Sequence, residues 1–286
     1  DTAFVVNLPR PFRMASHTQH PNSWFSDPSW LQALQVEQAV DSAALARQRI
    51  KGIPAAITPP WALETGKITI DHGQALRRAL ESAALPLVVC DLPPGVSCTW
   101  EKPWIVQHKH TRWLQAIDGQ FPSLPKHRSK QARKAVTQGL RLEPCADVAL
   151  LLQLHQQVRE RKSIPSDAAA LKRLLNWILT SPPQSSYVVY DDQNQAIASA
   201  TFLHNNGRTV YAFGGQERSN VSALATVLLI QQGIRDAEAV GNDIFDFGGS
   251  ADAGVDRFYA EFGAHAEPRF RAILVKGWAR PWLRVF

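Results

Sequence analysis

Apolar residues recur at helical spacing through much of the second half of the chain. Residues 146–162 and 166–183 carry apolar side chains three and four positions apart, which is typical of amphipathic helices. Residues 187–215 instead hold three short runs rich in β-branched and aromatic residues, separated by Asp-Asp-Gln-Asn and Asn-Asn-Gly turns. This pattern predicts two helices followed by a three-stranded antiparallel meander.

Further elements flank the meander on both sides. A basic stretch leads into a helix that we expect to end near Gly139, where glycine suits a helix C-terminus. The other elements expected in this half are a strand at 141–144, a buried helix at 221–240, a strand at 243–250, a helix at 255–263 and a strand at 271–277. Helices that pack on a mixed, largely antiparallel sheet form an α+β layered architecture.

The first third of the chain alternates short helices with proline-marked turns. Residues 29–46 and 71–85 carry apolar residues at helical spacing, and we expect two helices there. Residues 85–95 form a β-branched run that ends in a Pro-Pro-Gly turn, which predicts a buried strand. Residues 104–110 are a second strand candidate.

The length and composition are those of a globular protein with one large domain or two smaller ones. The chain has 286 residues, of which 45% are hydrophobic and 20% are charged, and this usage excludes a disordered chain. The character of the sequence changes after Pro125. We therefore expect a first domain at residues 1–120 and a second at residues 121–286.

The net charge of +6 arises from 31 Lys and Arg against 25 Asp and Glu. Much of the excess lies at residues 126–134, which hold five Lys or Arg and no acidic residue. A basic cluster attracts phosphate groups on nucleic acid, on a nucleotide-linked substrate or on a cofactor. A solvated helix face would have the same composition, so both interpretations stay open.

Several classes of protein are excluded by what the sequence lacks. Cys90, Cys98 and Cys145 are too few and too irregularly spaced for a disulfide framework or a zinc site. The longest uncharged apolar stretch, 219–234, is shorter than the roughly 20 residues of a membrane span, and no signal-peptide pattern is present. P-loop, metalloprotease, esterase and dinucleotide-binding motifs are absent. We expect a soluble, cytoplasmic protein without a metal site.

Four segments of the second half carry a resemblance to a known family. They are PKHRSKQARKAVTQGLRLE at 125–143, VRERKSIP at 158–165, TVYAFGG at 209–215 and FDFGGS…GVDRFYAEFGA at 245–264. In this order they resemble the motifs of FemAB/CelD-like acyltransferases of the GNAT superfamily, and residues 21–34 are a looser match. The resemblance implies two tandem GNAT-like domains, each a mixed sheet with flanking helices, of which the N-terminal one is divergent.

Proteins of this family join an activated acyl group to an amine. The resemblance therefore implies a bacterial N-acyltransferase with acyl-CoA or aminoacyl-tRNA as co-substrate, and with a small molecule or a cell-envelope precursor as amine acceptor. One alternative is a degenerate member that binds a nucleotide-linked sugar, a polymer or a protein partner without turnover. Another is a nucleic-acid-binding protein that uses the basic cluster.

Amide formation requires hydrogen-bond donors at the acyl carbonyl and an acceptor for the proton of the amine. Gly214 and Gly215 lack a Cβ and could bring backbone N–H groups close to a ligand, although a bulge or tight bend explains them equally well. Asp246, between two aromatic residues at a strand end, could have a raised pKa and act as a base. Alternatively, it accepts the amides of the turn that follows.

Two departures from the expected motifs concern the co-substrate. Residues 216–223 lack the glycines that would cradle the pyrophosphate of CoA at a helix N-terminus. Tyr259 stands where FemAB proteins typically have lysine, and tyrosine brings no positive charge at neutral pH. The catalytic candidates are Asp246 and Tyr259, and the substrate-binding candidates are Arg128, Lys130, Arg159, Lys162, Tyr211, Gly214, Gly215, Arg257 and Phe258.

Overall fold

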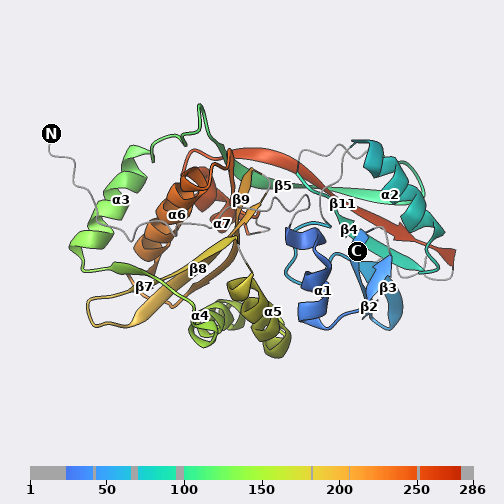
Figure 1. Cartoon of the computed structure of the whole chain (residues 1–286), viewed down its shortest axis with the longest axis horizontal. Helices are drawn as coiled ribbons and strands as arrows, with labels where there is room; N and C mark the ends of the chain where they lie inside the picture. Colours follow the sequence, from blue (N-terminus) through green and yellow to red (C-terminus); the bar gives the residue numbers. More distant parts are fainter. Residues whose placement is uncertain are drawn as a thin grey trace. The chain divides into compact units, whose positions relative to one another are not determined.

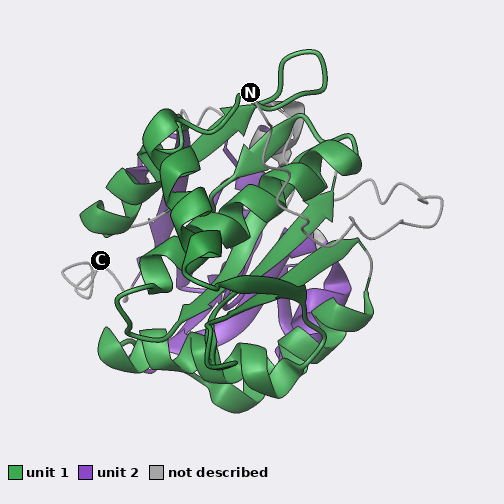
Figure 2. Ribbon diagram, turned by 90° about the vertical axis from the view of Figure 1, so that its left-hand side faces the viewer, with its two compact units in different colours: residues 1–19, 112–265 green, residues 20–111, 266–286 purple. Residues whose placement is uncertain are grey.

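The computed structural model describes residues 24–40, 43–65, 70–94, 100–181, 183–205, 207–249 and 252–277. The chain divides into two compact units (Figure 2). Among the described residues, unit 1 comprises 112–265, and unit 2 comprises 24–111 together with 266–277. The division lies between residues 111 and 112, and residues 266–277 belong to the unit of the first third.

Unit 1 is built on a mixed sheet. Its strand order is β5-β10-β9-β8-β7-β6. The strands are β6 (Arg141–Pro144), β7 (Gln184–Tyr190), β8 (Ala196–Asn205), β9 (Arg208–Gln216), β10 (Ile244–Asp246) and the end of β5 (Trp104–Gln115). Neighbours are antiparallel except for β9 and β10, which are parallel. A parallel pair needs a crossover, which is helix α6 (Ser222–Ala239).

Helices cover both faces of this sheet (Figure 1). Helices α3 (Lys126–Thr137) and α6 lie on one face, and α4 (Val148–Arg161) and α5 (Ala168–Thr180) lie on the other. Aspartate side chains cap the first turns of α4 and α5, since Asp147 Oδ1 accepts from the Ala149 N–H at 2.8 Å and Asp167 Oδ1 accepts from the Ala170 N–H at 2.9 Å. Helix α7 (Ala253–Ala260) follows β10. The elements expected in the second half are therefore confirmed, with shifted ends.

Unit 2 has its own mixed sheet, in the order β1-β2-β3-β4-β11-β5. Its elements are a 3₁₀ turn (Trp24–Ser26), α1 (Pro28–Leu34), β1 (Gln38–Val40), β2 (Ala43–Ile50), β3 (Ile53–Ile57), α2 (Ile70–Ser82), β4 (Leu87–Asp91), the first part of β5, and β11 (His265–Val275). Strands β3 and β4 are parallel, with α2 as their crossover. The α+β class that we expected is confirmed.

The helix expected at 29–46 is wrong beyond Leu34. The chain leaves α1 through Gln35 in the left-handed region (φ 57°) and then forms β1 and β2. The first four residues of β2, Ala43–Ala46, are all buried. A strand buried on both faces shows a continuous apolar run instead of alternation, and such a run is easily read as a helix.

Strand β3 and most of β2 were also absent from the expected elements. The two strands form a hairpin through Lys51 and Gly52, which both have positive φ (48° and 84°). Such turns match the right-handed twist of the strands they join. No helix in the described part of the chain is long and apolar enough to cross a membrane.

Candidate functional site

Strands β9 and β10 part at their carboxyl ends. They pair from Arg208 and Ile244 as far as Val210 and Asp246, where β10 ends, whereas β9 continues to Gln216. Among the described strands, residues 211–216 therefore pair only with β8. The carboxyl ends of neighbouring parallel strands form a crevice that α/β proteins use for ligands.

The hydrogen-bond phase of β9 determines which backbone groups face this crevice. Glu217 N–H donates to Ile197 O of the β8 side at 2.9 Å, and successive residues of an antiparallel ladder alternate in direction. Gly215 therefore bonds to β8, whereas the N–H and C=O groups of Gly214 and Gln216 point to the open edge. We call this segment, Tyr211 to Gln216, the open edge of β9.

Helix α4 covers the carbonyl groups of the open edge. His155 Nδ1 lies 3.1 Å from Gly214 O, and Arg161 Nη1 donates to Gln216 O at 3.4 Å. The N–H groups of Gly214 and Gln216 have no strand partner on this side within the described sheet. The open edge thus offers two hydrogen-bond donors to a ligand.

At both glycines of the open edge, another part of the protein occupies the space that a side chain would need. A Cβ at Gly215 would lie 2.6 Å from the Leu154 carbonyl carbon of α4, and one at Gly214 would lie 2.1 Å from the Tyr211 hydroxyl. A bulge in β9 also precedes them, because Thr201 pairs with Phe213 while Phe202 pairs with Tyr211. The bulge that we considered as an alternative is therefore present.

Aromatic rings span the gap between the two strands. Tyr259 of α7 packs against Phe247, which follows β10, at 4.9 Å between ring centroids, and against Tyr211 of β9 at 6.3 Å. Neither tyrosine hydroxyl has a hydrogen-bond partner among the described residues. Burial raises the pKa of Tyr211 to about 12, and burial together with the nearby Tyr211 raises the pKa of Tyr259 further. Both hydroxyls therefore remain protonated at neutral pH.

Asp246 is turned into the loop that follows β10. Its side chain is 3% exposed, and Oδ1 accepts the Gly248 N–H at 2.8 Å while Oδ2 lies 3.8 Å from Arg208 Nε. Gly248 and Gly249 have φ of 80° and 73°, a conformation that favours glycine. These contacts are those of the turn-holding alternative.

Arg128, which we expected to bind substrate, connects α3 to α7 by hydrogen bonds and ring contacts. Its guanidinium carbon lies 4.2 Å and 4.7 Å from the ring centroids of Phe258 and Phe262, and the side chain is 3% exposed. The guanidinium also donates to Glu261 Oε2 at 2.7 Å and to the Phe258 carbonyl at 3.0 Å. Its donors are thus directed into unit 1, whereas Lys130 on the same helix is exposed.

Two further ion pairs hold α7, which has no fully buried residue. Arg112 of β5 donates to both carboxylate oxygens of Asp256, at 2.9 Å and 2.7 Å. Lys162, at the end of α4, donates to Asp252 Oδ2 at 2.8 Å. Of the other candidates, Arg159 donates to the Pro165 carbonyl, and Arg257 is exposed.

The structure therefore brings Tyr211, Gly214 and Tyr259 together at the open edge. The sequence analysis missed His155, which lies in α4 among apolar residues. Nothing in the sequence distinguishes it from a core histidine, because its partner is the backbone of a residue 59 positions away.

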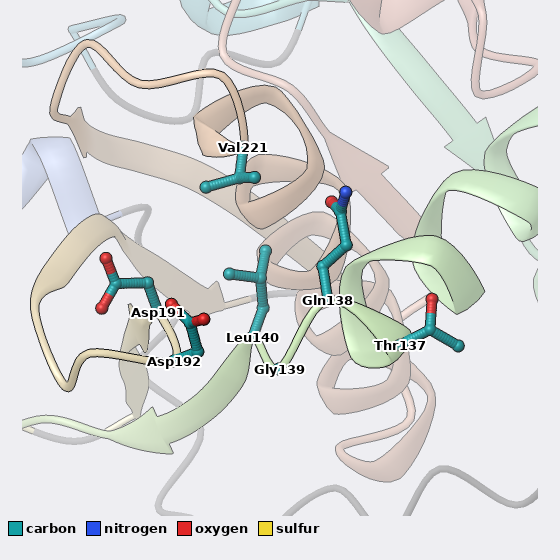
Figure 3. A pocket seen from close by; sticks show the side chains of 7 residues that line it. All are labelled: Thr137, Gln138, Gly139, Leu140, Asp191, Asp192 and Val221. Carbon is teal, nitrogen blue, oxygen red and sulfur yellow. The ribbon is translucent and has the colours of Figure 1, made fainter.

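A cavity of about 600 Å³ lies at the same end of the sheet (Figure 3). It is lined by the end of α3, the turn between β7 and β8, and the start of α6: Thr137, Gln138, Gly139, Leu140, Asp191, Asp192 and Val221. Helix α6 begins after Val221 without a side-chain cap. The two carboxylates disfavour a phosphate at this position, since like charges repel.

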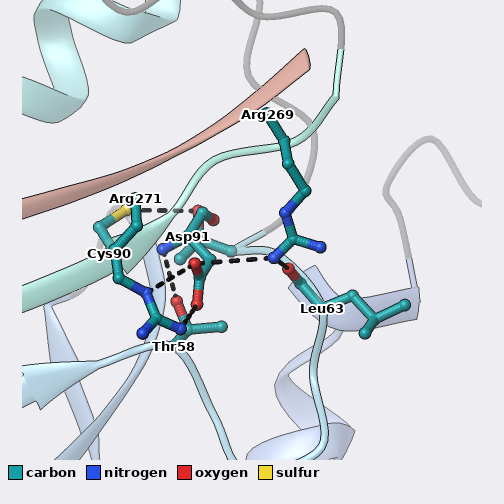
Figure 4. Close-up of polar contacts among 7 residues, drawn as sticks. Thr58, Leu63, Cys90, Asp91, Arg269 and Arg271 are labelled. Atoms are coloured by element: carbon teal, nitrogen blue, oxygen red, sulfur yellow. Dashed lines mark hydrogen bonds and ion pairs between the residues drawn. The ribbon is translucent and has the colours of Figure 1, made fainter. Parts of the chain in front are cut away.

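The parallel pair of unit 2 ends differently (Figure 4). Arg271 donates to both carboxylate oxygens of Asp91 at 2.9 Å and 2.8 Å, and Asp91 N–H donates to Thr58 Oγ1 at 2.8 Å. Arg269 lies 3.6 Å from the same carboxylate and donates to Leu63 O at 2.7 Å. The Thr58 contact joins the ends of β3 and β4, and both arginines come from β11. In unit 1, by contrast, β10 ends at Asp246 while β9 continues to Gln216.

Comparisons with known proteins identify the fold. No family model matches the chain, and no curated protein matches it in sequence. Among solved structures, FemX is similar with a TM-score of 0.57 and 11% identity, over 85% of this chain and 86% of that chain.

Two further solved structures are similar to the same degree. The C-terminal domain of a protein from Agrobacterium fabrum, described as a lysylphosphatidylglycerol synthetase, has a TM-score of 0.56 and 12% identity, over 81% of each chain. L-PGS from Bacillus licheniformis has a TM-score of 0.56 and 8% identity, over 91% of this chain and 96% of that chain. At these identities the likeness concerns the fold, and the FemAB-type fold that we expected is confirmed.

Proposed function

We propose that unit 1 is an N-acyltransferase whose acyl donor binds at the open edge of β9. The observation that carries this proposal is that β10 ends at Asp246 while β9 continues to Gln216, so that the N–H groups of Gly214 and Gln216 have no strand partner on that side within the described sheet. The Tyr211 hydroxyl lies beside Gly214. The shared fold with FemX supports it, although a fold alone does not determine an activity.

The proposed mechanism is direct attack of the amine on the bound acyl group. The carbonyl oxygen of the donor accepts hydrogen bonds from the open edge and from the Tyr259 hydroxyl, which stabilise the negative charge that develops there. The backbone donors are held by the sheet, so they need no reorganisation during the reaction. No cysteine or serine takes part, and Asp246 shapes the loop beside the site.

The two candidate co-substrates differ in how they would present phosphate. An acyl-CoA would place its pyrophosphate at the start of α6, where Asp191 and Asp192 lie and no glycine is present. An aminoacyl-tRNA would place phosphates against exposed cations such as Lys126, Lys130, Arg133 and Lys134 of α3. The charges therefore favour the aminoacyl-tRNA, with a small molecule or a cell-envelope precursor as amine acceptor.

A second candidate function is ligand binding without turnover. It is favoured by one observation, the position of Tyr211, whose hydroxyl occupies the space beside Gly214. A ligand carbonyl that approaches Gly214 must share this space with the Tyr211 side chain.

The test is to incubate the full chain with acetyl-CoA, longer acyl-CoAs or charged tRNAs, with hydroxylamine as a general amine acceptor, and to measure hydroxamate. We expect turnover with at least one donor, and a higher melting temperature in its presence. A raised melting temperature without hydroxamate would select the binding protein. If no donor has either effect, the proposed function is rejected.

A further inference from the structure

His155 is fixed in one tautomer by the open edge of β9. Its Nδ1 lies 3.1 Å from Gly214 O. Because a carbonyl oxygen can only accept a hydrogen bond, Nδ1 carries the ring proton, and Nε2 of the neutral ring keeps its lone pair. The ring also packs edge-on against Phe213, with 6.0 Å between ring centroids.

The second ring nitrogen has no partner. His155 Nε2 is a buried atom, and no described residue forms a hydrogen bond with it. Buried polar atoms without partners are rare in native proteins and often mark a functional site. Burial lowers the pKa of His155, and although the hydrogen bond to Gly214 opposes this, the charge of Arg159 adds to it. The ring is therefore neutral at neutral pH.

Other groups at the site are less suited to accept a proton. The Asp246 carboxylate accepts the Gly248 N–H and faces Arg208. Tyr211 and Tyr259 stay protonated because burial raises the pKa of each. The basic residues in the last turn of α4 are already cationic.

We propose that His155 is the general base of the acyl transfer, an inference that rests on the proposed function. The neutral amine attacks the acyl carbon, so that a carbon–nitrogen bond forms while the carbon–oxygen or carbon–sulfur bond of the donor breaks. The proton of the amine passes to Nε2 and then to the leaving oxygen or sulfur, which returns the ring to its neutral form. The Gly214 carbonyl stabilises the imidazolium between these steps.

One residue thus positions both parts of the reaction. The N–H of Gly214 lies at the open edge to receive the acyl oxygen, and its C=O orients the base. Neighbouring side chains cover Nε2 in this structure, and catalytic hydrogen bonds are often completed only when the substrate binds.

The tautomer can be tested without any substrate. Nitrogen NMR of the full chain with labelled histidine should show one ring protonated at Nδ1 and neutral at pH 7, and His155→Asn should remove this signal. A ring protonated at Nε2, or a charged ring at pH 7, would overturn the proposal.

The catalytic role is tested with hydroxylamine and the donor that is turned over. The amide N–H of His155→Asn can still donate to Gly214 O, but the side chain provides no base. We expect its kcat to fall by about 10²–10⁴-fold with KM little changed. His110→Asn, at an exposed position of β5, is the control and should keep the wild-type rate.

The pH profile separates a base from a structural side chain. The kcat of the wild-type chain should fall on the acidic side, as His155 becomes protonated, and His155→Asn should lack this limb. The charged group that acts on the ring, Arg159 of α4, does not titrate in this range. If His155→Asn retains the wild-type kcat and pH profile, His155 is not the base, although the acyltransferase function stands. If the wild-type chain transfers no acyl group, both proposals fail.

Discussion

The ring of Tyr259 packs against other aromatic rings, and no described residue forms a hydrogen bond with its hydroxyl. These rings are those of Phe247 and Tyr211. The resembling family typically has a lysine at this position. Because burial raises the pKa of Tyr259, the side chain remains neutral, and under the proposed function it would offer a hydrogen bond but no positive charge to a developing oxyanion.

Replacement of Tyr259 by phenylalanine tests this role, because it removes the hydroxyl and keeps the ring. We expect kcat to fall by about 10²–10³-fold, the loss typical of one oxyanion donor, with an unchanged melting temperature. Hydroxamate formation and calorimetry measure the two quantities. Tyr190→Phe, at the end of β7, makes the same chemical change away from the open edge and should leave kcat unaffected. An equal loss in both variants would contradict the assignment.

Asp236 of α6 is a buried carboxyl group that should make stability depend on pH. Ser185 Oγ donates to it at 2.6 Å and Gln232 Nε2 donates at 2.8 Å. Burial nevertheless raises its pKa, because these hydrogen bonds offset only part of the desolvation. A carboxyl group whose pKa is raised by folding contributes stability at low pH, and this contribution is lost as the pH rises through the folded pKa.

Asp236→Asn removes this ionisation. We expect the melting temperature of the variant, relative to that of the wild-type chain, to rise as the pH increases above about 4, the usual pKa of an unfolded aspartate. The trend is the diagnostic quantity, since the substitution also alters hydrogen bonds by an amount that does not depend on pH. A difference that stays constant over this range would show that folding does not raise the pKa of Asp236.

At the scale of the element, the shape of β9 depends on a position without a side chain and on a bulge. Gly215 has no side chain, so the backbone of α4 packs directly on the strand, and the bulge at Ala212 turns the strand beside the point where β10 ends. Helix α7 is held by the packing of Phe258 and Tyr259 and by polar contacts from Arg112 of β5, Arg128 of α3 and Lys162 at the end of α4. The site therefore depends on how neighbouring elements approach β9.

The two glycines of β9 should respond differently to alanine. The new Cβ in Gly215→Ala meets the backbone of α4, which cannot move alone, and we expect a loss of about 1–3 kcal/mol in the free energy of unfolding. The Cβ in Gly214→Ala meets the Tyr211 hydroxyl, the end of a movable side chain. This variant should lose less stability but more donor affinity. Denaturant unfolding and donor titration measure these effects, and equal unfolding free energies would contradict the packing argument.

At the scale of the whole molecule, local signals predicted well those elements that local interactions determine. The strand at 141–144 and the helices capped by Asp147 and Asp167 lie where the sequence indicated. Strand β2 was missed because its first half is buried on both faces and lacks alternation. The pairing of β11 with β4 could not be predicted from the sequence, because Arg271 of β11 and Asp91 of β4 are 180 positions apart.

The site residues that lie in local motifs could likewise be predicted, whereas the one that depends on a distant contact could not. Tyr211, Gly214 and Tyr259 lie in segments that resemble family motifs, so they could be singled out from the sequence. The contribution of His155 depends on the hydrogen-bond phase of a distant strand, which only the folded chain determines. Solved structures with 8–12% identity to this chain share its fold over most of their length.

The order of the chain has a consequence for its synthesis. Every described residue of unit 1 lies between the two segments that build unit 2, and β11, which stands between β4 and β5, is translated after all of them. On the ribosome, unit 1 can therefore complete its sheet while unit 2 still lacks an interior strand. A premature stop just after residue 265 would remove that strand and leave every residue of the open edge in the shortened chain.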